Sequence, residues 1–224
     1  MAREYGSVVS DARSQSVLST NKVIRNTYIL LSASLLFSAL MAGVAMATNA
    51  PPMGWFMILG YFGLLMMVHA FKNSPLGILF VFALTGFMGF TLGPILNSVI
   101  SSFSNGSQIV MTSLGGTGVV FLSLSAYALT TRKNFSYMGG FLAAMAMILF
   151  VSIIASMFIQ MPMFHLMISA FVMLFASGMI LFETSNIIHG GETNYIVATV
   201  SLFVSIYNLF ISLLQILTAL SGRD

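Results

Sequence analysis

Acidic side chains are almost absent from this chain of 224 residues, because residues 12–182 contain no aspartate and no glutamate. Glu183 ends that interval and lies near the end of a long apolar run. An ionisable group at the edge of such a run is costly to place, so it is a candidate for a functional role. Only 6% of the residues are charged and 58% are hydrophobic. Soluble domains carry about 25% charged residues, so this composition indicates an integral membrane protein.

The last apolar segment carries a polar stripe. Its members follow one another at spacings of four, three, four and three residues: Ser201, Ser205, Asn208, Ser212 and Gln215. This spacing puts all five side chains on one face of a helix. Hydrocarbon offers polar groups no hydrogen-bond partners, so the stripe should face protein or trapped water. We therefore expect the last helix to be central in a bundle.

Seven apolar segments are candidates to cross a bilayer, whose core of about 30 Å needs roughly 20 helical residues. They cover residues 27–47, 53–71, 76–98, 107–129, 137–159, 163–182 and 195–220. The sequence thus predicts an all-α membrane protein with a seven-helix transmembrane domain over residues 27–224. A cleaved signal peptide ending at Ala45-Met46-Ala47 is an alternative for the first segment. Its apolar run and the polar leader before it are too long for that.

Residues 1–26 differ from the rest of the chain. They are polar, rich in serine and carry charges of both signs, without a sustained apolar period. This pattern predicts a flexible cytoplasmic N-terminal tail. The tail is either a disordered leader without a role or a handle that another protein can grasp.

Small residues and a proline interrupt the third segment. Gly89 and Gly93 form a GxxxG pair, which lets two helices approach closely. Pro94 lacks a backbone N–H group and is expected to kink the helix. We predict that Gly86, Gly89, Gly93 and Pro94 serve close packing, with a hinge for opening and closing as the alternative.

Basic residues fall on one side of a seven-span protein. This set is Lys22, Arg25, Lys72, Arg132 and Lys133. The loops on the other side, near Asn49, Asn105 and Gln160, carry no charge. The positive-inside rule therefore predicts a cytoplasmic N-terminus and a C-terminus on the opposite side of the membrane. The net charge of +3 reflects this topology, and we expect no nucleic-acid partner.

Motifs for catalysis are missing from the sequence. It contains no HExxH zinc motif, no GxSxG nucleophile motif and no phosphate-binding loop. The absence of cysteine excludes thiolate chemistry and disulfides. We expect neither an enzyme nor a cofactor. A calcium site would take about six to eight oxygen ligands, usually with several carboxylates, and Glu183 with a serine and an asparagine falls short of that.

Glu183 has two interpretations. It is a solvated carboxylate at the membrane rim, or it lies more than a turn inside its helix and faces the bundle. The second holds if the helix continues through Ile187 and Ile188. Glu183 could then bind or release a proton, with partners on the last helix. Histidine changes its charge near neutral pH, and the candidates for pH sensing and gating are Glu183, Ser205, Tyr207, Asn208 and His189.

Several segments resemble the Bax inhibitor family of seven-span membrane proteins. They are residues 85–89 (TGFMG), 92–94 (LGP), 182–188 (FETSNII) and 202–210 (LFVSIYNLF). Three others resemble the YccA-type bacterial branch of that family, whose members are inner-membrane modulators of the AAA protease FtsH. These are residues 25–28 (RNTY), 129–133 (LTTRK) and 189–196 (HGGETNYI). The likeness covers essentially the whole chain after the tail.

This resemblance implies a fold in which two three-helix layers wrap the last helix. It also implies that some members are pH-sensitive calcium leaks, in which two aspartates on the sixth and seventh spans act as latch and proton sensor. Glu183 matches the first aspartate, whereas Ser205 stands at the second. A carboxylate and a hydroxyl cannot share a proton as two carboxylates can. The acidic pair is therefore broken in this chain.

Two functional hypotheses follow from the resemblance. The first is a bacterial inner-membrane regulator, without enzyme activity, that binds the FtsH complex and restrains proteolysis of membrane proteins. Its N-terminus would be cytoplasmic and its C-terminus periplasmic. The alternative is a leak for calcium ions or protons through the bundle, gated near Glu183.

Overall fold

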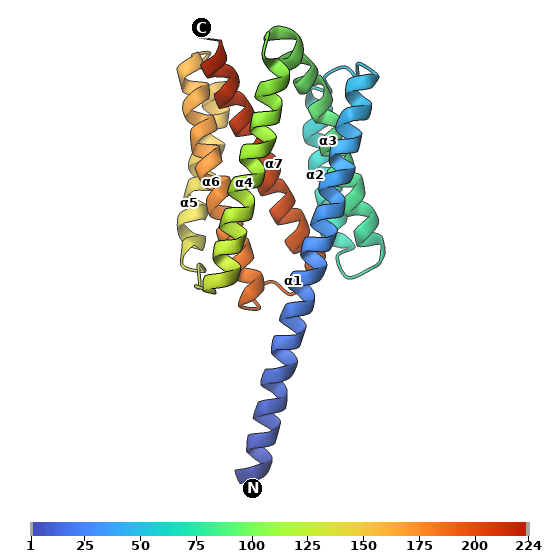
Figure 1. Cartoon of the computed structure of the whole chain (residues 1–224), viewed down its shortest axis with the longest axis vertical. Coiled ribbons are helices and arrows are strands. Elements are labelled where there is room, and N and C mark those ends of the chain that lie inside the picture. Colours follow the sequence, from blue (N-terminus) through green and yellow to red (C-terminus); the bar gives the residue numbers. More distant parts are fainter. Residues whose placement is uncertain (1, 223–224) are drawn as a thin grey trace.

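The computed structural model describes residues 2–222 of the chain and the side chains of residues 22–222. Over this range the chain forms seven α-helices (Figure 1). They are α1 (Ala2–Ala47), α2 (Trp55–Ala70), α3 (Leu76–Ser102), α4 (Gly106–Thr131), α5 (Met138–Ser156), α6 (Pro162–Ile188) and α7 (Tyr195–Ser221). The predicted all-α class is confirmed.

Six of the helices in the described range are long and apolar enough to cross a membrane, and α2 is shorter. Its 16 residues span about 24 Å, less than a hydrocarbon core of about 30 Å. The predicted segment 53–71 is longer than α2 because Gly54 has φ +53° and precedes the helix. At the other end, Phe71 closes α2 and begins the turn before α3.

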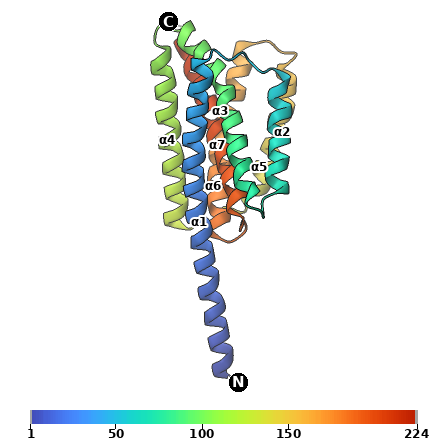
Figure 2. The same ribbon diagram turned by 90° about the vertical axis from the view of Figure 1, so that its right-hand side faces the viewer.

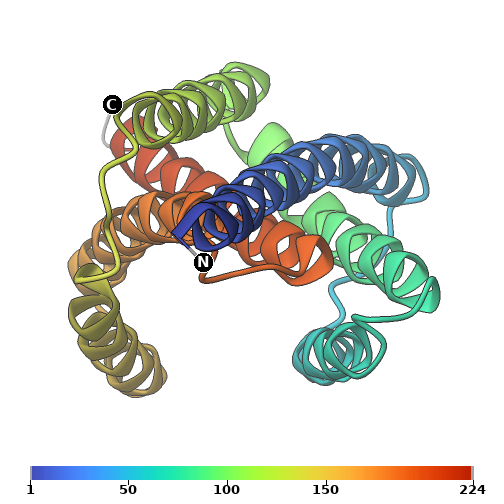
Figure 3. The same ribbon diagram turned by 90° about the horizontal axis from the view of Figure 1, so that it is seen from below.

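Helix α7 is the most buried of the long apolar helices. Within its most apolar window 67% of the residues are buried, against 56% for α3 and 33% or less for the other four. It packs against α1, α2, α3, α4 and α6, whereas α5 packs only against α6. Figure 3 shows α2 and α5 at the outside of the bundle. The polar stripe predicts such an interior place for the last helix.

Helices α1 and α3 pack closely through glycine. A Cβ atom added at Gly89 would collide with the backbone carbonyl of Ser38, and one at Gly93 would collide with Ala45. One added at Gly86 would meet the ring of Phe37. The absence of side chains therefore brings the two backbones together, as GxxxG pairs do. Helix α3 continues on both sides of Pro94, and the hinge stays a prediction.

Helix α1 begins far before the predicted span at residue 27, and its first part extends beyond the bundle (Figures 1 and 2). The sequence predicted a flexible tail over residues 1–26. Residue 1 and the side chains of residues 2–21 lie outside the described part of the chain. The flexibility of this segment therefore stays a prediction, and its backbone is helical from Ala2 onward.

Candidate functional site

The connection between α6 and α7, residues 189–194, closes one end of the bundle. Gly190 has φ +74°, a conformation that glycine adopts without steric cost. The turn is held by N–H groups of Gly190 and Gly191, which donate to the carbonyls of Ile187 (3.3 Å) and Asn186 (2.9 Å). This tight turn reverses the chain so that α7 returns into the bundle.

Asn194 joins the start of α7 to the loop between α2 and α3. Its side-chain oxygen accepts hydrogen bonds from the N–H groups of Ile196 (3.0 Å) and Val197 (3.3 Å), which caps the helix. Its side-chain amide donates to the carbonyl of Lys72 (2.9 Å) and to the side-chain oxygen of Asn73 (3.0 Å). One residue thus fixes both the helix start and a neighbouring loop.

Ser185 and His189 join the end of α6 to the loop between α4 and α5. Ser185 accepts a hydrogen bond from the N–H of Phe135 (2.9 Å) and donates to the carbonyl of Lys133 (3.2 Å). His189 Nε2 lies 3.1 Å from the carbonyl oxygen of Arg132, and Nδ1 lies 2.8 Å from that of Ser185. Because carbonyl oxygens only accept, both histidine bonds form together only when the ring is doubly protonated.

These contacts bring the predicted set of basic residues to one end of the bundle, which we call the basic end. Residues 72–73 and 132–135 meet the α6–α7 connection there. Helix α1 passes the same end, where the Thr199 hydroxyl donates to the carbonyl of Thr27 (3.3 Å). The segments that resemble the bacterial branch of the family, 25–28, 129–133 and 189–196, thus lie at one end of the structure.

Glu183 lies five residues before the end of α6. The helix continues through Ile187 and Ile188, so the condition for the second interpretation of Glu183 is met. Its side chain is half-buried, and the next residue, Thr184, is buried. Glu183 follows Met179 by four residues, so both lie on one face of α6.

Part of the polar stripe lines a cavity of about 230 Å³ between α2, α6 and α7. The stripe contributes Ser201, Ser205 and Asn208. Helix α2 contributes Tyr61 and His69, which the sequence analysis did not select. These are polar residues on an apolar helix, two turns apart with Leu65 between them, and that pattern could have identified them. These three members of the stripe therefore face protein and a cavity, as the spacing predicted, whereas Gln215 at its far end is exposed.

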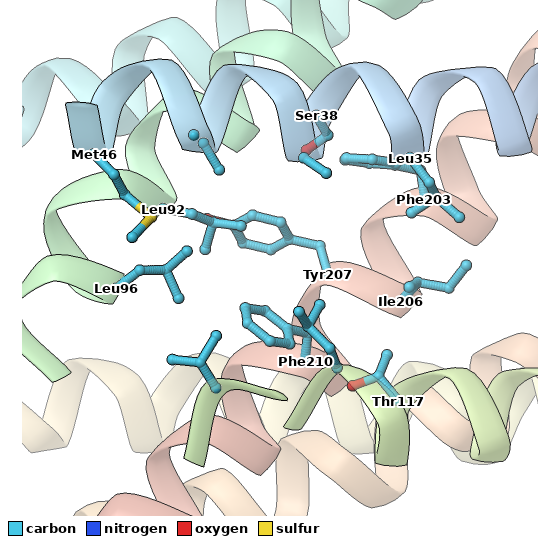
Figure 4. Close-up of a pocket in the computed structure, with 15 residues that line it drawn as sticks. Leu35, Ser38, Met46, Leu92, Leu96, Thr117, Phe203, Ile206, Tyr207 and Phe210 are labelled. Atoms are coloured by element: carbon cyan, nitrogen blue, oxygen red, sulfur yellow. The ribbon is translucent and has the colours of Figure 1, made fainter. Parts of the chain in front are cut away.

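Tyr207 lies on another face of α7. Its hydroxyl group is 3.4 Å from the hydroxyl of Thr91, and its ring lines a second cavity of about 310 Å³ (Figure 4). Of the predicted set, Ser205 and Asn208 lie together, and Tyr207 lies apart from them. Among the described side chains, Glu183 and His189 line neither of these two cavities.

The far end of the stripe makes a direct contact with α6. The Ser169 hydroxyl donates a hydrogen bond of 2.6 Å to the side-chain oxygen of Gln215. Over residues 22–222, histidine, aspartate and glutamate nowhere form a group of three that could hold a metal ion. The fully buried polar side chains of the described residues are all serine or threonine.

Long apolar helices that turn part of a polar stripe toward a cavity between them define a multi-pass α-helical membrane protein. The family model described as "Inhibitor of apoptosis-promoting Bax1" matches residues 20–222. The chain therefore belongs to the Bax inhibitor family, and the resemblance found in the sequence is confirmed.

Three bacterial relatives are similar over nearly their whole length. A protein of Escherichia coli strain K12 named "Modulator of FtsH protease YccA" is 50% identical over 93% of this chain and 94% of its own. An uncharacterized protein of Pasteurella multocida is 50% identical over 97% and 98%. An uncharacterized protein of Pseudomonas aeruginosa is 48% identical over 90% and 91%. The resemblance to the YccA-type branch is confirmed as well.

Proposed function

We propose that this protein is a bacterial inner-membrane regulator that binds the membrane-anchored AAA protease FtsH and restrains its proteolysis of membrane proteins. The observation that carries this proposal is the identity of 50%, over 93% of the chain, with the relative named a modulator of FtsH protease. The role is that of a partner and not of a catalyst.

The proposed topology has seven membrane crossings, with α7 between the layers α1–α3 and α4–α6. Contacts within each group support these layers, since α3 packs on both α1 and α2, and α6 packs on both α4 and α5. A bilayer can thin locally around the short α2. The basic end would face the cytoplasm by the positive-inside rule, with the C-terminus in the periplasm.

In this orientation the N-terminal part of α1 would project into the cytoplasm, where the protease has its ATPase. Most of the stability of a helix in a protein comes from tertiary packing, and the first part of α1 extends beyond the bundle (Figure 1), so a pulling ATPase could engage this segment easily. The bundle that follows would resist extraction, because α1 and α3 are packed backbone to backbone at Gly89 and Gly93. A protein that the protease engages but extracts only slowly would keep the protease occupied and so slow its degradation of other membrane proteins.

The proposal is tested by co-purification from membranes in mild detergent. Tagged protein should retain FtsH, whereas an unrelated multi-pass protein with the same tag should not. A variant that lacks residues 2–20 separates the tail from the bundle as the binding element. If the full-length protein and the unrelated control retain equal amounts of FtsH, the direct interaction is refuted.

The alternative, a pH-sensitive leak, has one structural feature in its favour. The cavity between α2, α6 and α7 is polar at Ser205 and Asn208, and Glu183 lies one turn beyond its wall residue Met179 on the same helix face. Against it, this chain offers one carboxylate where the leak mechanism uses two. Regulation of the protease therefore remains the function that we propose.

A further inference from the structure

The cavity beside Tyr207 differs in chemistry from the one that holds the polar stripe. It lies between α1, α3, α4 and α7, and nearly all of its wall is apolar (Figure 4). Two of its three hydroxyl groups have hydrogen-bond partners. Thr117 donates to the carbonyl of Ser113 (2.7 Å), and Tyr207 pairs with Thr91. Ser38 is the third hydroxyl in the wall, and one serine on an otherwise apolar wall is little for a polar ligand to bind. An apolar cavity also does not hold water well.

This cavity opens sideways between α1 and α4. In the described part of the chain, no Cα atom of α1 comes within 8 Å of one in α4. Ala39, Gly43 and Leu114 line the cavity and are also exposed at its rim. Toward the basic end, the rings of Tyr28 and Phe121 come together with centroids 6.3 Å apart. The opening thus faces the bilayer in the half of the helices that is farther from the basic end.

The length and volume of the cavity fit a single hydrocarbon chain. Its wall on α1 runs from Leu35 to Met46, about 16 Å at the helical rise per residue. That is close to half of a bilayer core of about 30 Å. An apolar cavity of about 150 Å³ takes up benzene, so the 310 Å³ present here has room for about a dozen carbon atoms. A helix of that length and about 10 Å in diameter would fill roughly 1,200 Å³, which is far too much.

We propose that this cavity is a binding site for one phospholipid acyl chain, drawn from the leaflet opposite the basic end. Moving a chain from the bilayer into the cavity gains no hydrophobic free energy, because both surroundings are apolar. The gain is dispersion contact, since an empty cavity leaves its wall atoms without partners. The bound chain would bridge α1 and α4 and touch α7, the most buried of the long apolar helices.

The test uses the full-length protein in phospholipid vesicles that contain a lipid with a diazirine on its acyl chain. After irradiation, mass spectrometry locates the adducts. Phe203 and Phe210 are only 1% and 5% exposed, and both line the cavity. We expect adducts on these α7 residues as well as on outer residues such as Leu36. Adducts confined to the outer residues would overturn the proposal.

A variant with a large side chain inside the cavity provides the matched comparison with the wild-type protein. Gly43 lines the cavity, and a Cβ atom added there meets nothing within 4 Å, as is also true of Gly63 on α2. Gly43→Trp should abolish the α7 adducts and leave those on Leu36, whereas Gly63→Trp should change neither. If Gly43→Trp does not fold, Ala39→Phe fills the same space. Persistent α7 adducts in a folded, filled variant would overturn the proposal. The wild-type protein should also give the α7 adducts in native membranes that contain the labelled lipid. If it gives none there, a protein segment occupies the site, and the proposal is likewise overturned.

Discussion

The side-chain amide of Asn194 donates a hydrogen bond of 2.9 Å to the backbone carbonyl of Lys72. This bond connects the start of the most buried helix to a basic loop that is 122 residues away in the sequence. The same side chain caps α7 through its oxygen atom. Asn194 therefore holds the basic end together in two separable ways.

Asn194→Ala should destabilise the protein by about 2 kcal/mol, of which about 1 comes from the lost cap and about 1 from the lost contact with the loop. Asn194→Asp keeps a capping oxygen and loses the amide donor, so it should recover about half of the loss. The midpoints of thermal unfolding in detergent rank the stability of wild type and the two variants. Equal midpoints for wild type and Asn194→Ala would show that neither role matters.

Gly89→Ala should destabilise the contact between α1 and α3. The new Cβ atom would collide with the backbone carbonyl of Ser38, and overpacking of this kind costs about 1–3 kcal/mol. Gly63→Ala is the matched control, since its Cβ atom would meet nothing within 4 Å. Alanine is favoured over glycine in a helix by roughly 0.5–1 kcal/mol, so the control should unfold at a slightly higher temperature. Similar shifts for both variants would refute close packing at Gly89.

Ser205→Asp tests why the leak mechanism is not favoured here. The substitution supplies the second carboxylate of the acidic pair that the family resemblance implies, and Ser205 lines a cavity that can receive it. Two carboxylates that share a proton respond to pH differently from a carboxylate and a hydroxyl. We expect calcium flux into liposomes to be absent with wild type and to become pH-dependent with Ser205→Asp. Ser205→Asn is the isosteric control, and flux with that variant would disprove a role for the pair.

Glu183→Gln in the Ser205→Asp background completes that experiment. The amide cannot ionise, so the pH dependence gained from Ser205→Asp should disappear. Wild-type flux that depends on pH and is abolished by Glu183→Gln alone would instead favour the leak over the regulator.

Deletion of residues 2–20 should alter how the protease handles this protein. The segment forms the part of α1 that extends beyond the bundle (Figure 1). Without it, the ATPase would lack an accessible end, so the half-life of the protein in cells that contain FtsH should lengthen. A scrambled segment of equal length is the control, because it keeps the length and composition. An unchanged half-life after deletion would refute the role of the segment as a handle.

The sequence predicted most helix limits because turn residues are local signals. The starts of α3 at Leu76 and of α7 at Tyr195, and the end of α1 at Ala47, agree with the predicted segments. The end of α6 was predicted six residues too early. Its last turns carry polar residues, and they remain helical where Ser185 and Ile187 are buried against other elements. Such tertiary contacts leave no trace in local hydropathy.

The candidate site was predictable only in part for a similar reason. The period of the polar stripe placed Ser205 and Asn208 on one face without knowledge of the fold. Tyr207 follows Ser205 by two residues, about 200° around the helix, so its separate place could have been foreseen. That Tyr61 and His69 of α2 complete the cavity depends on which helices pack together. Local patterns along the chain do not show which helices are neighbours.

The most direct test of the proposed function is the rate at which purified FtsH degrades a model membrane substrate in proteoliposomes, with and without this protein. We predict slower degradation that scales with the amount of added protein, while a soluble substrate of the same protease is degraded at an unchanged rate. An unrelated multi-pass protein at the same density controls for crowding. Equal rates with this protein and with that control would contradict the proposal that it restrains the protease.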